Sequence, residues 1–314
     1  MGLFVLLSVF VATFPLYARA FDIRVLTSML MYIILAVSWA MFSGSTGYMS
    51  LAPAAFFGIG VYTIALAQDY LPFYVIIFVG GLVSFAFALL VGLVTLRLKG
   101  IYFTIFTFGL VVFLSEMVYY VASQVGQTRG IDIMPQPRAT LLYTMFGLAV
   151  VTVIAIYFIR RSRLGLALLS IGGNEEAAAH MGINTTRVKV LGFAISALFM
   201  GAAGVVTAPA LIYIDNRIAF SLFYSFMPIL MAVFGGMGQL YGPVIGAAVF
   251  GYLAKTLRAQ LYDYFMLGFG IILVVVILFL PNGIVGLVPM LQNKLGGVIA
   301  KLRKGGQANQ HANT

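Results

Sequence analysis

The sequence predicts an all-α, polytopic membrane protein, a bundle of about eight to ten transmembrane helices. Hydrophobic residues make up 62% of its 314 residues and charged residues only 8%, whereas a soluble domain carries roughly 25% charged residues. Its apolar runs are continuous rather than alternating, as in residues 75–96. Because backbone groups in lipid must be satisfied within a helix or a closed barrel, continuous runs favour helices.

Ten apolar segments are candidates for the helical spans, each of which needs about 20 residues. They cover residues 1–18, 25–43, 50–67, 73–96, 100–121, 140–160, 189–209, 221–235, 243–257 and 264–280. The first resembles a signal peptide, but no Lys or Arg precedes its apolar stretch, so we expect it to be retained. Glycine and proline interrupt 50–67 and 221–257, and a segment beside the uncharged connections 44–49 and 236–242 could instead be re-entrant.

The basic residues indicate the orientation, because cytoplasmic loops carry an excess of Lys and Arg. With the N-terminus inside, eleven of the eighteen lie on the cytoplasmic side, at positions 97, 99, 160, 161, 163, 187, 189, 294, 301, 303 and 304. The other side receives positions 19, 24, 129, 138, 217, 255 and 258. We therefore predict a multi-pass protein of the bacterial inner membrane with both termini cytoplasmic.

The composition excludes several other functions. There is no cysteine and there are only two histidines, so no metal site or other cofactor is predicted and no catalytic cluster is available for an enzyme. The net charge of +10 is spread over membrane loops rather than one soluble face, which argues against nucleic-acid binding. No G-x-x-x-x-G-K-[ST] phosphate loop is present, so energy must come from another chain or an ion gradient.

The longest predicted cytoplasmic connection, residues 161–188, contains a short helix of its own. Asn174 can cap it, Glu175 and Glu176 occupy the first turn where the helix dipole favours anions, and residues 177–179 are alanines. Gly182 suits the left-handed position that ends it. Such a helix between two spans can sit in a groove on a partner, so we expect a coupling element.

This loop fits the EAA loop of ABC importer permeases, with Glu176-Ala177-Ala178 followed by Gly182. Over roughly residues 25–290 the chain is similar to permeases of branched-chain amino acid ABC transporters, of the LivM and LivH type. The similar stretches include residues 54–60, 98–103, 162–165, 174–184, 235–246 and 279–286. The resemblance implies that Asn174, Glu175, Glu176, Ala177, Ala178 and Gly182 couple the chain to an ATPase.

The resemblance also implies partners: cytoplasmic ATP-binding subunits, a second permease subunit and a periplasmic substrate-binding protein. We expect residues 1–290 to form the permease domain. Residues 291–314 form a basic cytoplasmic tail that contacts membrane lipids.

Interrupted helices are the best sequence indicator of a translocation path. The hypothetical path residues are Ser50, Gly58, Gly60, Glu116, Gly235, Gly236 and Gly238. Helix packing is the alternative for the glycines, and an interfacial anchor is the alternative for Glu116. The family usually has a histidine before residue 54, where this chain has Ser50-Leu51-Ala52-Pro53.

The sequence thus predicts a permease subunit of an ATP-driven importer for branched-chain or related amino acids. An ABC permease for urea, amides or aromatic acids is one alternative. A single-chain, ion-coupled secondary transporter is another, although it would be expected to hold ionisable residues near the bilayer midplane.

Overall fold

The computed structural model describes residues 17, 19–124, 130–260, 270, 274 and 283. The predicted spans 1–18 and 264–280 fall almost wholly outside these residues, as do Arg129 and the predicted basic tail 291–314.

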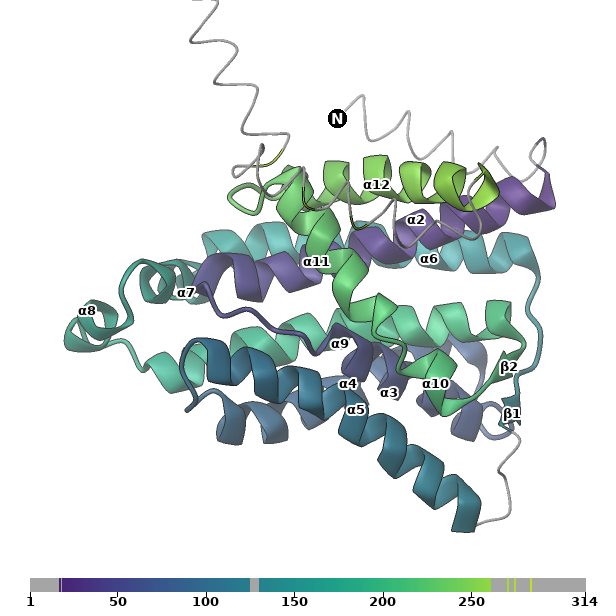
Figure 1. Ribbon diagram of the computed structural model, residues 1–314, viewed down its shortest axis with the longest axis horizontal. Helices are drawn as coiled ribbons and strands as arrows, with labels where there is room; N and C mark the ends of the chain where they lie inside the picture. Colours follow the sequence, from purple (N-terminus) through teal and green to yellow (C-terminus); the bar gives the residue numbers. More distant parts are fainter. Residues whose placement is uncertain are drawn as a thin grey trace, which may run out of the picture.

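The described residues form helices joined by short turns, with one two-stranded antiparallel sheet (Figure 1). The elements are α2 (Ala20–Trp39), the π-helical turn η1 (Ala40–Gly44), α3 (Pro53–Ala67), α4 (Phe73–Thr95), α5 (Ile101–Gln124), β1 (Ile131–Asp132), α6 (Arg138–Arg161), α7 (Arg163–Gly173), α8 (Glu175–His180), α9 (Thr185–Leu211), β2 (Tyr213–Ile214), α10 (Asn216–Ala219), α11 (Phe223–Gly235) and α12 (Tyr241–Gln260).

Six segments of the described chain are long and apolar enough to cross a membrane. They are Ala20–Gly44, Phe73–Thr95, Ile101–Gln124, Arg138–Arg161, Thr185–Leu211 and Asn216–Gly235. Each matches one predicted span, and two further predicted spans correspond to the shorter apolar helices Pro53–Ala67 and Tyr241–Ala254. The predicted polytopic helix bundle is therefore confirmed.

The predicted span 50–67 is wrong at its start. Helix α3 begins only at Pro53, which occupies the first turn, where its missing N–H is no loss. Its 15 residues extend about 22 Å, well short of a hydrocarbon core of roughly 30 Å. The chain reaches α3 through residues 45–52, which are not part of a regular helix apart from the last turn at 45–46.

Helix α9 lies at the centre of the bundle, where α3 and α4 pack along it. Small residues permit this close approach: a Cβ on Gly60 would lie 1.9 Å from the carbonyl oxygen of Gly201, and one on Gly204 would lie 2.2 Å from that of Phe57. Helix α2 packs on α6 and α12, and α11 packs on α12 and α2. Helix α5 makes few contacts with the other helices and diverges from the bundle toward its C-terminal end (Figure 1).

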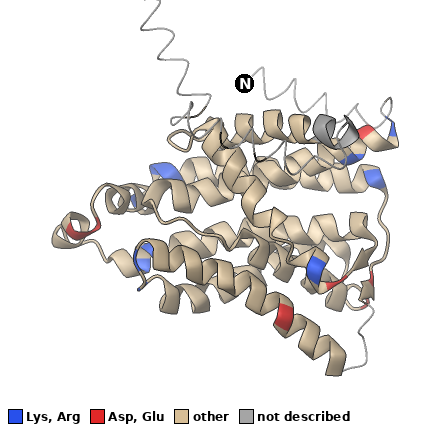
Figure 2. Ribbon diagram, in the orientation of Figure 1, with Lys and Arg blue, Asp and Glu red and all other residues tan. Residues whose placement is uncertain are grey.

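The two ends of the bundle differ. Helices α7 and α8 protrude at one end, and the β1–β2 sheet and α10 lie at the other (Figure 1). Charged residues are concentrated toward these ends (Figure 2). The described basic residues that the sequence assigns to the cytoplasm all lie at the α7–α8 end, in the α4–α5 turn, the end of α6 and the starts of α7 and α9.

Candidate functional site: a helix break joined to a protruding loop

The chain between η1 and α3, residues 45–52, is named here the break segment. Its Ser45, Thr46, Ser50 and Ala52 are buried. Buried irregular backbone requires partners for its N–H and C=O groups, because solvent cannot supply them. Side chains from the neighbouring helices provide these partners.

Helices α2 and α5 hold the middle of the break segment. Trp39 Nε1 donates to the Ser50 carbonyl over 2.8 Å. On the other side, Thr104 Oγ1 donates to the Met49 carbonyl over 2.9 Å, and Thr107 Oγ1 accepts from the Leu51 N–H over 3.0 Å. These bonds tie both helices to the backbone of this segment.

Helix α11 holds the end of the break segment through one buried hydroxyl. Ser225 Oγ donates to the Leu51 carbonyl over 2.8 Å and accepts from the Ala54 N–H over 3.0 Å. Ser225 has no exposed surface. One side chain thus satisfies a carbonyl of the break segment and a free N–H in the first turn of α3.

The space beside the break segment is dry. It is bordered by Trp39, Ser43, Ser50, Phe56, Phe193 and Met200, among others, and has no room for a water molecule. The hydrogen bonds of this region are therefore made directly between protein groups.

The α7–α8 protrusion forms as the sequence predicts at its caps. Asn174 Oδ1 accepts from the Ala177 N–H over 3.0 Å at the start of α8. Gly182 has φ +84°, a left-handed conformation that suits glycine. Asn184 caps α9 by accepting from the Arg187 N–H over 3.1 Å.

Helix α7 was not predicted within the connection 161–188. Ser162 caps it by accepting from the Gly165 N–H over 3.5 Å. Its inward face carries Leu164, Leu168 and Ile171 at helical spacing, and the last two are buried. That spacing and the serine were the signals that could have identified it.

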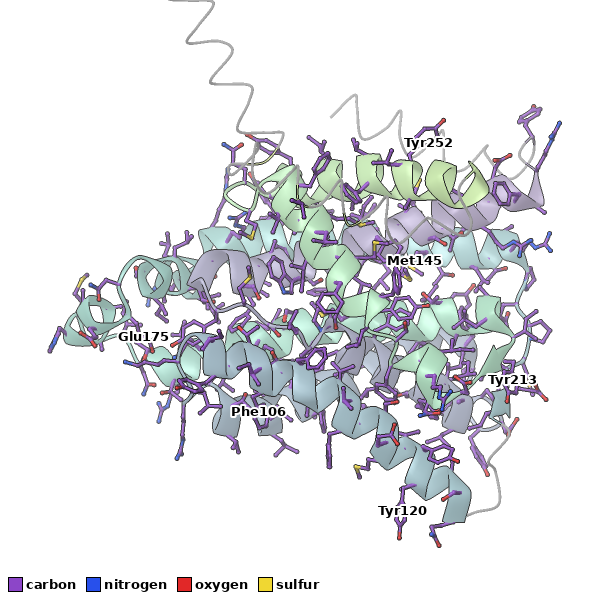
Figure 3. All side chains as sticks on the ribbon, in the orientation of Figure 1. Phe106, Tyr120, Met145, Glu175, Tyr213 and Tyr252 are labelled. Atoms are coloured by element: carbon purple, nitrogen blue, oxygen red, sulfur yellow. The ribbon has the colours of Figure 1, made fainter. Side chains whose placement is uncertain are left out.

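The two glutamates of α8 differ in their surroundings. Glu176 is 82% exposed and lies 3.9 Å from Lys99. Glu175, labelled in Figure 3 where α8 meets the bundle, is 21% exposed and pairs over 2.6 Å with Lys189, which is 3% exposed. Tyr48 of the break segment donates to the second carboxylate oxygen of Glu175. Glu176 is thus available to a partner, and Glu175 is engaged within the chain.

The electrostatics of this cluster favour a charged Glu175. Burial alone would raise the pKa of its carboxyl, but hydrogen bonds from Lys189 and Tyr48, with the attraction of Lys189 and Lys99, hold the pKa below its usual value. Burial, followed by the hydrogen bond to Glu175 and its negative charge, raises the pKa of Tyr48. The arrangement is therefore a carboxylate, an ammonium and a neutral phenol.

The predicted path residues do not meet in one cavity. Gly58 and Gly60 on α3 lie in helix contacts, with a Cβ on Gly58 falling 2.4 Å from the Phe220 ring. Gly235 packs against Gly242 in the same way. These contacts favour packing for the three glycines Gly58, Gly60 and Gly235.

The remaining path residues have other surroundings. Gly236 ends α11 with φ +102°, which a side chain would strain. Gly238 has open space where a Cβ would lie, and its carbonyl accepts from Arg160 over 3.1 Å. Glu116 is exposed on α5, whereas Ser50 is buried in the break segment.

The two glycine-rich interruptions do touch each other. A Cβ on Gly44, at the end of η1, would lie 3.2 Å from the Met237 Cβ, in the turn between α11 and α12. Segments almost two hundred residues apart in sequence therefore meet at the α7–α8 end of the bundle.

A cavity of about 450 Å³, which was not predicted from the sequence, lies toward the opposite end. Helices α2, α6, α9 and α11 enclose it, and its lining includes Arg24, Thr27, Tyr32, Arg138, Met145 and Thr207. The sequence places both arginines at the outer ends of spans, but only the fold brings α2 and α6 together. Among the described residues no group of three or more His, Asp or Glu is placed to hold a metal ion.

Comparison with known proteins identifies the family. A family model described as the permease component of branched-chain amino acid transport systems matches residues 23–277. The chain belongs to this permease family. The permease is 29% identical to the high-affinity branched-chain amino acid transport system permease protein LivM of Salmonella typhimurium, over 92% of this chain and 76% of the relative.

Two further relatives support the assignment. LivM of Escherichia coli K12 is 27% identical to the permease, over 98% of this chain and 78% of the relative. LivH of Salmonella typhimurium is 33% identical over 41% of this chain and 42% of the relative. The permease is thus a multi-pass transport protein of the ABC type.

Proposed function

We propose that the permease is one membrane subunit of an ATP-driven importer that moves branched-chain or related amino acids across the bacterial inner membrane. It works with a second permease subunit, cytoplasmic ATP-binding subunits and a periplasmic substrate-binding protein. The observation that carries this proposal is the capped, protruding α8, with Glu176 exposed at its start, in a chain of the branched-chain amino acid permease family.

The surroundings of the charged residues support an external energy source. Within the described chain, the one charged residue counted as buried is Lys189, and it lies at the α7–α8 end in an ion pair. An ion-coupled carrier would be expected to hold ionisable groups at mid-depth in the bundle. Glu116, an acid in the middle of α5, lies on an exposed surface of that helix.

We place Asn174, Glu175, Glu176, Ala177, Ala178 and Gly182 in the coupling element. Asn174 and Gly182 fix the ends of α8, and Glu176 faces a partner. Residues 1–290 then form the permease domain with its coupling loop at 161–188. Residues 291–314 form a basic tail at the lipid surface, and both termini are cytoplasmic.

For the translocation path we retain Ser50, Gly236 and Gly238 as a gate region. Gly58, Gly60 and Gly235 support it through helix packing, and Glu116 lies outside it on an exposed surface of α5. Gly238→Leu is the best test of this role, because a Cβ at residue 238 would lie in open space and the residue does not have a positive φ. The substitution should therefore not strain the fold. We expect the variant to assemble normally and to lose uptake. Normal uptake by Gly238→Leu would remove that residue from the gate.

The function is tested by reconstitution. The permease is purified with its three kinds of partner and placed in vesicles, and uptake of leucine, isoleucine, valine, urea, an amide and an aromatic acid is measured with and without ATP. We expect ATP-dependent uptake of the branched-chain amino acids. Uptake by vesicles that hold this chain alone, with no nucleotide, would contradict the proposal.

A further inference from the structure

We propose that Tyr48, Glu175 and Lys189, named here the latch, fasten the α7–α8 protrusion to the break segment, so that both move as one body when an ATP-binding subunit displaces α8. This inference rests on the proposed function for its driving force. It gives Glu175 an internal positioning role in place of the expected contact with the ATPase.

Lys189 is the centre of the latch. Its ammonium donates to Glu175 Oε1 over 2.6 Å, to the Tyr48 hydroxyl over 3.1 Å and to the Leu96 carbonyl over 3.2 Å. An ammonium has three hydrogens, so all its donors are used. The side chain thereby joins the first turns of α9 to α8, to the break segment and to the carbonyl end of α4, where the helix dipole favours a cation.

Tyr48 connects this centre to the break segment. Its hydroxyl accepts from Lys189 and donates to Glu175, so it bridges the two charges. The Lys189 ammonium also lies 4.4 Å from the centre of the Tyr48 ring, and the ring packs edge-on against Phe103 of α5 at 5.6 Å between centroids. Tyr48 is therefore fixed at both its ring and its hydroxyl.

A second contact joins the same two segments a few residues away. A Cβ on Gly172 of α7 would lie 2.1 Å from the Ser45 carbonyl oxygen, whereas one on Gly173 would meet nothing within 4 Å. The protrusion therefore presses on the start of the break segment through α7 and holds Tyr48 through α8. Two separated contacts resist rotation as well as translation.

The consequence follows from what holds the break segment. Its backbone is bonded to Thr104, Thr107 and Ser225 rather than to a helical ladder. Displacement of α8 through the latch would thus act on the side-chain hydrogen bonds that join the break segment to α5 and α11. Each of these hydrogen bonds can break and re-form independently of the others. The latch delivers the movement to the middle of the bundle.

Spin labels test whether the two segments move together. The chain contains no cysteine, so Met49→Cys and Met181→Cys, at positions 47% and 78% exposed, carry the labels without further changes. We expect one narrow distance distribution in the complete transporter that stays the same with and without ATP. With Tyr48→Phe the distribution should broaden. A wild-type distance that changes with ATP would overturn the latch.

Coupling provides the second measurement. Tyr48→Phe keeps the ring and removes one hydroxyl, so folding should survive. We expect uptake per ATP hydrolysed to fall roughly tenfold, the factor typical for loss of a hydrogen bond to a charged group. Tyr74→Phe, at an exposed position of α4, is the matched control. A coupling ratio for Tyr48→Phe equal to that of the control would refute the latch.

A glycine pair tests the contact through α7. Gly172→Ala should separate the protrusion from the break segment and lower the coupling ratio, and Gly173→Ala should not. Equal ratios in the two variants would remove this contact from the inference. If the chain binds no ATP-binding subunit, the proposed function fails. The nucleotide-free comparison of label distances in wild type and Tyr48→Phe still decides on the latch.

Discussion

Two adjacent glutamates on α8 are expected to contribute very differently to the stability of the fold, because their surroundings differ. Glu175 pairs with a lysine that is only 3% exposed, whereas Glu176 is 82% exposed. Removing one partner of a buried pair leaves an uncompensated charge, which typically costs about 3 kcal/mol. Exposed pairs contribute about 0–1 kcal/mol.

We therefore expect Glu175→Ala to lower the free energy of unfolding by about 2 to 3 kcal/mol, because it strands Lys189. Glu176→Ala should change it by less than about 0.5 kcal/mol. Thermal unfolding of the purified permease in detergent measures both. Equal melting temperatures for the two variants would contradict the pairing of Glu175 with Lys189.

The same pair predicts a pH dependence. Since the pKa of Glu175 is lowered in the folded chain, its stabilisation is fully present above the unfolded pKa of about 4.3. It is lost as the pH falls through the folded pKa. The difference in melting temperature between wild type and Glu175→Gln should therefore narrow below about pH 4. A difference that widens on acidification would show that the carboxyl is neutral in the fold.

Ile212 is a second position with a particular local conformation. Among the described residues it is the one non-glycine with positive φ, at +65°, and its side chain is 61% exposed. A β-branched residue in this region is strained. We expect the free energy of unfolding of Ile212→Gly to be roughly 1 kcal/mol higher than that of Ile212→Ala in a thermal unfolding experiment, which inverts the usual order of the two residues. The usual order at this site would show that no strain is present.

At the scale of elements, small residues set the spacing of α3 and α9. A Cβ on Gly60 would overlap the Gly201 carbonyl at 1.9 Å, whereas one on Gly109 of α5 meets nothing within 4 Å. Gly60→Ala should therefore destabilise the permease by about 1–3 kcal/mol. Gly109→Ala should be neutral or stabilising by up to about 1 kcal/mol. Thermal unfolding of the two variants checks this, and a harmless Gly60→Ala would mean that the helices are further apart.

The sequence predicted the helices better than the segments that connect them. Long apolar runs determine where α4, α5, α6 and α9 lie, and Asn174 and Gly182 determine the ends of α8, because these signals are local. The sequence predicted a connection at 44–49 but not that irregular backbone continues to residue 52, since its backbone partners Thr104, Thr107 and Ser225 come from distant positions in the chain. Hydroxyl groups in apolar helices give no local sign of which backbone they serve.

The same limit applied to the coupling residues. The acidic first turn of α8 was predicted from Glu175 and Glu176 together, but only the fold shows that they face opposite surroundings. The partner of Glu175, Lys189, was read from sequence simply as a cytoplasmic charge. Its burial depends on α4, α8 and the break segment meeting at one point.

At the scale of the whole molecule, the segregation of basic residues to two ends predicts a sidedness. Single cysteines at Met181, beside α8, and at Met134, beside the β1–β2 sheet, are 78% and 54% exposed. With α8 cytoplasmic, a membrane-impermeant maleimide should label Met134→Cys in intact spheroplasts and Met181→Cys only after lysis. The opposite pattern would reverse the topology.

The dry packing around Trp39, Ser43 and Ser50 also has a consequence for the movement of protons through the protein. A proton crosses a membrane protein along a file of water molecules or titratable groups. The space bordered by Trp39, Ser43 and Ser50 has no room for a water molecule, and none of the residues that line it is titratable. This space therefore offers no route for a proton past the interruption between η1 and α3.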